Sequence, residues 1–79
     1  MLVSAPTGLK QRREELTPKV SQEHLARKAD ITLATYRSAE RGNKVQYSTA
    51  KKILDALNAE RHARSLPDVS LDDIGLVLE

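Results

Sequence analysis

Residues 21–42, SQEHLARKADITLATYRSAERG, decide the fold of this 79-residue chain. The stretch contains two short segments of helical character, SQEHLARKA and LATYRSAERG, with the turn Asp30-Ile31-Thr32 between them. Ser21 and Thr32 are residue types that cap helix N-termini, and Gly42 suits the left-handed residue that follows a helix. The sequence therefore predicts two helices joined by a tight turn.

The second of these helices has two different faces. A rotation of about 100° per residue places Thr35, Tyr36 and Ala39 on the expected inner face, where Ala39 is small and Tyr36 is a bulky anchor. The first helix supplies a matching strip of Leu25, Ala26 and Ala29. The opposite stripe of the second helix consists of Leu33, Ala34, Arg37, Ser38 and Arg41. This stripe is predicted to face solvent, which holds the helix out as a rigid probe for a DNA major groove.

The same stretch resembles the Cro/cI-type helix-turn-helix family, also called the XRE family, of bacterial and phage DNA-binding proteins. The residues that match its consensus are Ser21, Gln22, Glu23, Leu25, Ala26, Ile31, Thr32, Thr35, Tyr36, Glu40 and Gly42. Residues 45–58, VQYSTAKKILDALN, resemble the family's fourth helix, so the likeness covers about residues 8–58. Asp30 stands where the family usually has glycine, but Asp tolerates the left-handed region better than most residues. The resemblance implies an all-α, lambda-repressor-like bundle of about five short helices, with the helix-turn-helix at helices two and three.

The other helices are less regular in sequence. The first is expected over about residues 6–16, capped by Ser4 or Thr7, and its register stays open because residues 16–20 contain Pro18. The fourth is expected over about residues 48–59, with 60–65 as a possible extension. Ser70-Leu71-Asp72-Asp73 has the form of a capping box and predicts a short fifth helix, whereas residues 76–78 could equally be extended. The expected core positions of the first and fourth helices are Leu9, Leu16, Val20, Ala50, Ile53, Leu54 and Leu57.

Length and composition favour one small domain. Seventy-nine residues can bury one modest core, and 39% hydrophobic residues are more than a disordered chain carries. The absence of cysteine excludes disulfides and thiolate metal sites. No apolar run approaches the roughly 18 residues of a membrane span, and the N-terminal residues lack the features of a signal peptide. We therefore expect a cytoplasmic protein, bacterial or phage-encoded by resemblance, with no cofactor, no metal and no membrane contact.

Charge divides the chain into two parts. Residues 1–65 hold all thirteen basic residues against seven acidic ones, a net charge of +6. Residues 66–79 hold four acidic residues and no basic one. A basic body favours phosphate binding, although an ordinary solvated surface would have the same composition. We expect a DNA-binding domain over residues 1–65 and an acidic, apolar tail over 66–79, a short helix or extended segment that contacts a dimer mate or partner.

DNA contacts are expected from the exposed stripe and from the residues after it. Base contacts are predicted for Leu33, Ala34, Arg37 and Ser38. Arg37 can form a bidentate contact with guanine, and its alternative roles are a phosphate clamp or a solvated residue. The resemblance implies that the residues at the places of Leu33, Ala34 and Ser38 face bases. Phosphate contacts are predicted for Gln22 (by resemblance), Arg41, Asn43, Lys44, Ser48 and Thr49, the last two at a helix N-terminus.

Two further residues are assigned a structural role. The resemblance implies a partly buried ion pair between Arg13 and Glu40 that ties the first helix to the third. The remaining titratable residues do not suggest an enzyme: His24 and His62 lie on separate helices and are expected at the surface, and the acidic pair Asp72-Asp73 fits the N-terminus of a helix.

The favoured function is a sequence-specific transcriptional regulator, a repressor that reads an operator in double-stranded DNA as a homodimer. Two alternatives stay open. One is an antitoxin that represses its own promoter and holds a toxin through residues 66–79. The other is a protein-interaction module that kept the fold without DNA binding, which the apolar Leu33-Ala34 pair supports. Salt-sensitive binding to duplex DNA separates the first two from the third.

Overall fold

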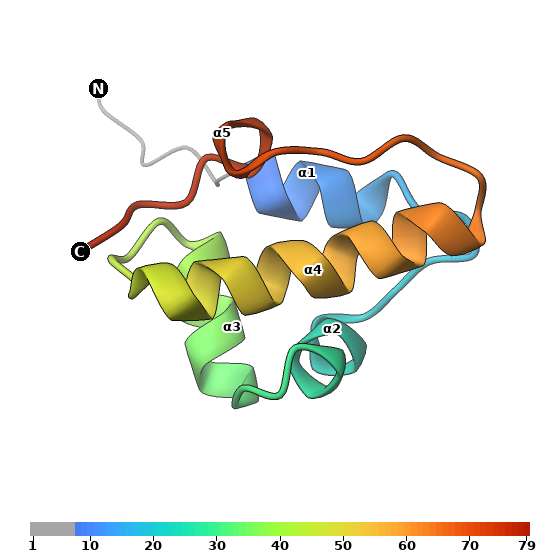
Figure 1. The fold of residues 1–79 in the computed structure, drawn as a ribbon. Helices are drawn as coiled ribbons and strands as arrows, with labels where there is room; N and C mark the ends of the chain where they lie inside the picture. The colour runs from blue at the N-terminus through green and yellow to red at the C-terminus, as the bar shows by residue number, and fades with distance from the viewer. Residues whose placement is uncertain (1–7) are drawn as a thin grey trace, which may run out of the picture.

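The computed structural model describes residues 8–79 and shows an all-helical bundle over that range (Figure 1). The helices are α1 (Gly8–Glu14), α2 (Gln22–Lys28), α3 (Leu33–Glu40), α4 (Tyr47–Ala63) and α5 (Leu71–Ile74). Val45 and Leu78 form an isolated parallel β-bridge, and no longer strand occurs within the described residues. The prediction of an all-α fold with five short helices is confirmed.

The predicted helix ends of the central pair have the expected caps. Ser21 Oγ accepts a hydrogen bond from the His24 amide at 3.0 Å, and Thr32 Oγ1 accepts one from the Thr35 amide at 3.1 Å. Asp30 adopts a left-handed φ of 61° in the turn. The chain can make this turn without glycine because Asp is one of the residue types that tolerate positive φ.

The end of α1 differs from the sequence prediction, and α4 takes the longer of the two predicted forms. α1 ends at Glu14 rather than near residue 16, and the residues proposed as its caps, Ser4 and Thr7, lie outside the described range. α4 continues past residue 59 to Ala63, within the possible extension predicted over residues 60–65. The extension is stabilised by tertiary contacts: Glu60 and Arg61 are buried, and Arg61 Nε donates to the Pro67 carbonyl at 2.7 Å.

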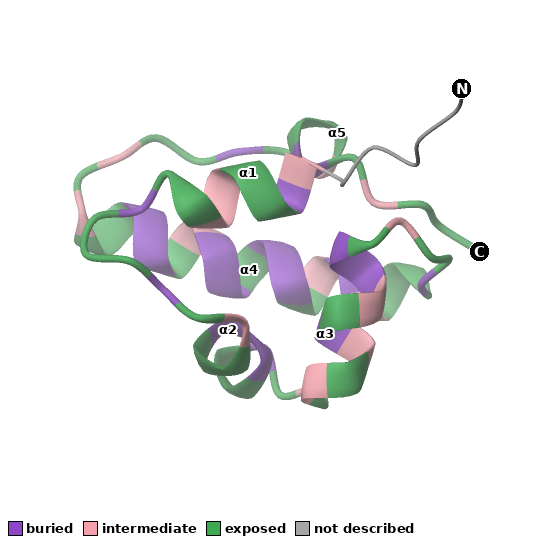
Figure 2. Cartoon of the chain, turned by 180° about the vertical axis from the view of Figure 1, so that it is seen from behind, coloured by how far each residue is buried: buried purple, intermediate pink, exposed green. Residues whose placement is uncertain are grey.

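The hydrophobic core forms around α4. α2 and α3 contact each other extensively, α2 also packs on α4, and α1 lies on another side of α4 together with α5 (Figure 1). Figure 2 shows buried residues recurring along α4 and on the inner sides of α2 and α3. The largest fully buried side chains are Leu9, Leu16, Leu25, Tyr36, Ile53, Leu57 and Ile74. Every core position predicted in the first and fourth helices is buried.

The acidic tail, residues 66–79, folds back onto the bundle (Figure 1). Val69 exchanges two hydrogen bonds with the Asn58 side chain, at 2.9 and 3.0 Å, and Ile74 is completely buried. α5 approaches α1 so closely that a Cβ on Gly8 would lie 2.4 Å from the Asp73 carbonyl oxygen. Only glycine allows this approach, so the tail and the first helix contribute to one continuous core.

The last residues are extended. The Val45 amide donates to the Val77 carbonyl at 2.8 Å, and the Glu79 amide donates to the Val45 carbonyl at 2.9 Å. These two bonds fix the end of the described chain beside the loop between α3 and α4. No helix within residues 8–79 is long and apolar enough to cross a membrane.

Candidate nucleic-acid interface

α3 presents one face to the core and one to solvent. Tyr36, Ala39 and Glu40 are buried. The exposed positions on this helix and at its end are Ala34, Arg37 and Arg41. Arg37 therefore faces solvent, as the sequence predicts. α3 has an exposed face of the kind that a groove-binding helix needs.

Three positions on α3 differ from the periodicity prediction. Periodicity predicts Leu33 on the outer stripe, but in the structure Leu33 is half-buried and packs against the core, as Ile31 does. An apolar side chain at the first residue of the helix gains by covering the edge of the core. Thr35 and Ser38 are both half-buried, and the buried face is completed by Glu40 rather than by Thr35. Of the predicted base-contacting residues, Ala34 and Arg37 are thus the most accessible.

Glu40 is a buried carboxylate held by two helices. Arg13 Nε on α1 donates to Glu40 Oε2 at 2.7 Å, and Gln22 Nε2 at the start of α2 donates to Oε1 at 2.9 Å. The Glu40 side chain is only 3% exposed. Burial by itself would raise the pKa of Glu40, but the hydrogen bonds from Arg13 and Gln22 outweigh it and lower the pKa. The ion pair of Arg13 and Glu40 is present and fixes α3 against α1.

Tyr36, on the inner face of α3, is the largest fully buried side chain among the described residues. Burial and the negative charge of the neighbouring Glu40 raise the pKa of its hydroxyl. The phenol is therefore neutral at any physiological pH. It anchors the inner face of α3 without adding a charge near the exposed side of the helix.

Gln22 links this buried group to the exposed face of α3. Its carbonyl Oε1 accepts a hydrogen bond from Arg37 Nε at 3.2 Å, while its Nε2 is bound to Glu40. The residue that the resemblance assigned to a phosphate contact is thus hydrogen-bonded within the protein to a residue predicted to contact bases.

The predicted phosphate-binding residues gather near the end of α3 and the start of α4. Arg41, Asn43, Lys44 and Ser48 are exposed, and Thr49 is half-buried. Asn43 Nδ2 also donates to Ser38 Oγ at 2.9 Å, which braces the last turn of α3. The N-cap of α4, Gln46, makes no side-chain capping bond. The first amides of this 17-residue helix therefore lack a side-chain acceptor at the cap position.

A hollow of about 410 Å³ lies between these two elements. It brings together four of the predicted DNA-contacting residues, Ala34, Ser38, Lys44 and Thr49. Glu79 lines the same hollow, although the sequence analysis assigned residues 66–79 only to dimer or partner contacts. The sequence contains one indication of this position of Glu79, namely that residues 76–78 could be extended. An extended end can pair with Val45 and so bring Glu79 to the hollow.

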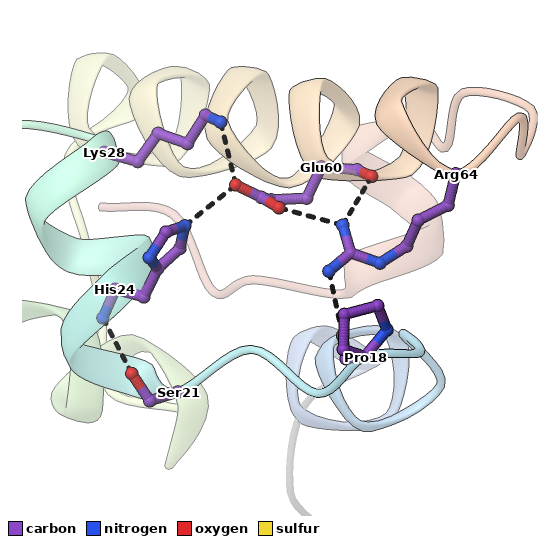
Figure 3. A network of polar contacts seen from close by, with 6 residues as sticks. All are labelled: Pro18, Ser21, His24, Lys28, Glu60 and Arg64. Carbon is purple, nitrogen blue, oxygen red and sulfur yellow. Dashed lines mark hydrogen bonds and ion pairs between the residues drawn. The ribbon is translucent and has the colours of Figure 1, made fainter.

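A second buried carboxylate, Glu60, fixes α2 to α4 (Figure 3). Glu60 Oε2 accepts from Lys28 Nζ at 2.7 Å and lies 2.9 Å from His24 Nε2, and Oε1 accepts from Arg64 NH1 at 2.8 Å. These hydrogen bonds, that of Lys28 first, lower the pKa of Glu60 to about 2. Sequence analysis predicted only that His24 lies at the surface and missed this cluster, because His24 and Lys28 on α2 are more than 30 residues from Glu60 on α4.

Arg64 extends the cluster to the loop between α1 and α2. Its NH2 donates to the Pro18 carbonyl at 2.8 Å, and its Nε donates to the Thr17 carbonyl at 3.2 Å. Arg64 therefore fixes the loop between α1 and α2 to the end of α4. Within residues 8–79 no group of three or more His, Cys, Asp or Glu side chains is arranged to hold a metal ion.

Comparison with known proteins identifies the family. A family model described as helix-turn-helix matches residues 9–62, more than half of the chain. The match begins in α1, includes the α2–α3 pair with Arg13 and Glu40, and ends in the last turns of α4. No curated protein and no solved structure matches the chain significantly. On the family match and the exposed face of α3, the chain belongs to the Cro/cI-type helix-turn-helix family of DNA-binding proteins.

Proposed function

We propose that this protein is a transcriptional repressor that inserts α3 into the major groove of an operator. The observation that carries the proposal is the division of α3: its buried face is fixed to α1 and α2 through Glu40, and its opposite face leaves Arg37 exposed. A helix used for recognition must be both rigid and accessible, and α3 meets both conditions.

Each exposed residue of α3 has a defined role in this proposal. Arg37 makes a bidentate contact with guanine, and Ala34 touches a thymine methyl group. Ser38 supplies a weaker polar contact, and Leu33 contributes the part of its side chain that the core leaves uncovered. Phosphates are bound by Lys44 and Thr49, which line the hollow, and by four residues outside its lining, which are Gln22, Arg41, Asn43 and Ser48.

The repressor is proposed to act as a homodimer. α3 has eight residues and is therefore about 12 Å long, which reaches only a few base pairs. Two copies related by a two-fold axis double the contacts on a palindromic site and give the specificity that one helix cannot supply. The mass of the protein–operator complex in solution tests this stoichiometry directly.

Selection of preferred sites from a random duplex library, followed by binding at several salt concentrations, tests the function. A repressor selects a short palindrome and binds it less tightly as salt rises, because each bound phosphate releases counterions. Failure of the protein to bind any duplex would contradict the proposal and favour a protein-interaction module. Co-purification of a protein encoded beside it would instead favour an antitoxin that holds a toxin through residues 66–79.

Replacement of Arg37 with alanine is expected to reduce guanine preference at one base pair of each half-site by about tenfold, because a bidentate contact is lost. The matched control is Arg41→Ala, also exposed at the end of α3. Loss of a phosphate contact should weaken binding to all sequences about equally and reduce the salt slope by about one. Library selection with both variants measures the difference. An unchanged base preference in Arg37→Ala would exclude Arg37 from base recognition.

Replacement of Glu79 with glutamine is expected to increase affinity for duplex DNA about twofold at low salt. Glu79 lines the hollow together with Lys44 and Thr49, so its negative charge repels a phosphate bound there. The gain should fade above about 0.2 M salt, because the charge is screened. Asp72→Asn serves as the control, since it removes an exposed acidic residue from α5 instead. Equal effects of the two variants would show that only net charge matters.

A further inference from the structure

We infer that Gln22 is a positioning residue for Arg37: it transmits the fixed orientation of the buried Glu40 carboxylate to the guanidinium on the exposed face of α3. This inference rests on the proposed function, since it assigns Arg37 to base recognition. It adds a residue on α2, outside the recognition helix, that controls how α3 reads one base pair.

The first step is the orientation of the Gln22 amide. An ionised carboxylate can only accept hydrogen bonds, so the Gln22 side chain must direct its NH₂ group toward Glu40. That bond measures 2.9 Å, and Arg13 holds the carboxylate from the other side. Because Glu40 is buried and fixed by two helices, the amide of Gln22 has one favoured orientation. Its carbonyl oxygen then points away from Glu40.

The second step is the capture of Arg37. The carbonyl oxygen of Gln22 accepts from Arg37 Nε at 3.2 Å. This bond uses one of the five donors of the guanidinium, the one on Nε, and leaves the outer N–H groups of the two terminal nitrogens for another partner. Two terminal nitrogens in one plane form the fork that a guanine O6 and N7 pair accepts. The contact thus selects the end-on geometry for base recognition.

The third step is the cost of ordering. Arg37 is exposed, and a free arginine side chain loses much rotamer freedom when it binds. A hydrogen bond already present in the unbound protein reduces that loss. The contribution of this hydrogen bond is confined to the base pair that Arg37 reads, so its loss changes the base preference at that position, in addition to any loss of a phosphate contact by Gln22.

The test compares Gln22→Ala, Arg37→Ala and the double variant in selection from a random duplex library. Gln22→Ala should reduce guanine preference at the Arg37 position by about 2- to 10-fold, the value of one ordinary hydrogen bond. The double variant should show no further loss at that position relative to Arg37→Ala. Gln11→Ala is the matched control, because Gln11 is an exposed glutamine on α1. It should leave all preferences unchanged.

A uniform loss of affinity in Gln22→Ala, with unchanged base preferences and an unchanged salt slope because an uncharged amide releases no counterion, would identify Gln22 as a phosphate contact only and overturn the inference. A second measurement needs no DNA. Exchange of the Arg37 Nε proton with solvent, followed by NMR, should become about 2- to 10-fold faster in Gln22→Ala. Unchanged exchange overturns the inference even if Arg37 recognises guanine. Failure of the wild type to bind DNA would instead reject the proposed function.

Discussion

Replacing Arg13 with alanine is expected to lower the free energy of unfolding by about 3 kcal/mol at neutral pH. The variant leaves the Glu40 carboxylate buried without its ion-pair partner, and Glu40 is only 3% exposed. Gln22 still donates one hydrogen bond, which keeps the effect at the lower end of the range for broken buried pairs. Urea denaturation measures the change, which is a large share of the stability of so small a domain.

The matched control is the preceding residue. Arg12 pairs with Glu15 at 3.3 Å on the surface of α1, where both side chains are at least one-third exposed. Arg12→Ala should change the free energy of unfolding by less than about 1 kcal/mol, because solvent screens such a pair. A double-mutant cycle of Arg13→Ala and Glu40→Gln should show strong coupling. Absence of coupling would mean that the pair does not fix α1 to α3.

The destabilisation of Arg13→Ala should shrink in acid. In the wild type, the folded-state pKa of Glu40 is lowered, so its contribution to stability is present above the unfolded pKa and is lost as the pH falls. Without Arg13, burial dominates and raises the pKa of Glu40 in the variant. The variant then relieves its buried charge by taking up a proton, and the two unfolding free energies approach each other as the pH falls from the raised pKa of the variant, above 4.5, toward the lowered pKa of the wild type.

The parts of the fold that sequence analysis predicted correctly are those with local signals. Ser21, Thr32 and the Ser70-to-Asp73 capping box act over three residues, and each makes the expected bonds. Asp30 takes the left-handed conformation that its place in the turn predicted. Periodicity also identified the outward direction of Arg37. Such features are decided within one or two helical turns, and a single sequence contains the whole interaction.

The parts that were missed depend on contacts between distant segments. Glu79 reaches the hollow because residues 77–79 pair with Val45. The extension of α4 over residues 60–63 was predicted only as a possibility, since Glu60 and Arg61 bind partners on other segments. The requirement for glycine at residue 8 arises from the Asp73 carbonyl at the other end of the chain. The hydrophobic periodicity of a single helix does not indicate such long-range contacts, because they depend on how the tail packs across the bundle.

Glu60 provides the second large expected effect. Glu60→Gln should lower the free energy of unfolding by about 2–3 kcal/mol at pH 7, because the shift of the Glu60 pKa from its ordinary value of 4.5 to about 2 measures how strongly the fold favours the charged form. The side chain is only 10% exposed, so solvent screens these contacts weakly. Urea denaturation at pH 7 gives the difference. Glu23→Gln, which breaks an exposed pair with Arg27, is the control and should cost less than about 0.5 kcal/mol.

The pH dependence of this variant separates charge from packing. A lowered folded-state pKa stabilises the protein fully above pH 4.5 and ceases to do so as the pH falls toward 2. The wild type should therefore lose about 2–3 kcal/mol more than Glu60→Gln across this interval, and their stabilities should converge near pH 2. A constant difference at all pH values would attribute the loss to packing. Lys28→Ala should cost much less than Glu60→Gln, because Arg64 and His24 still bind the carboxylate and the lysine itself is 40% exposed.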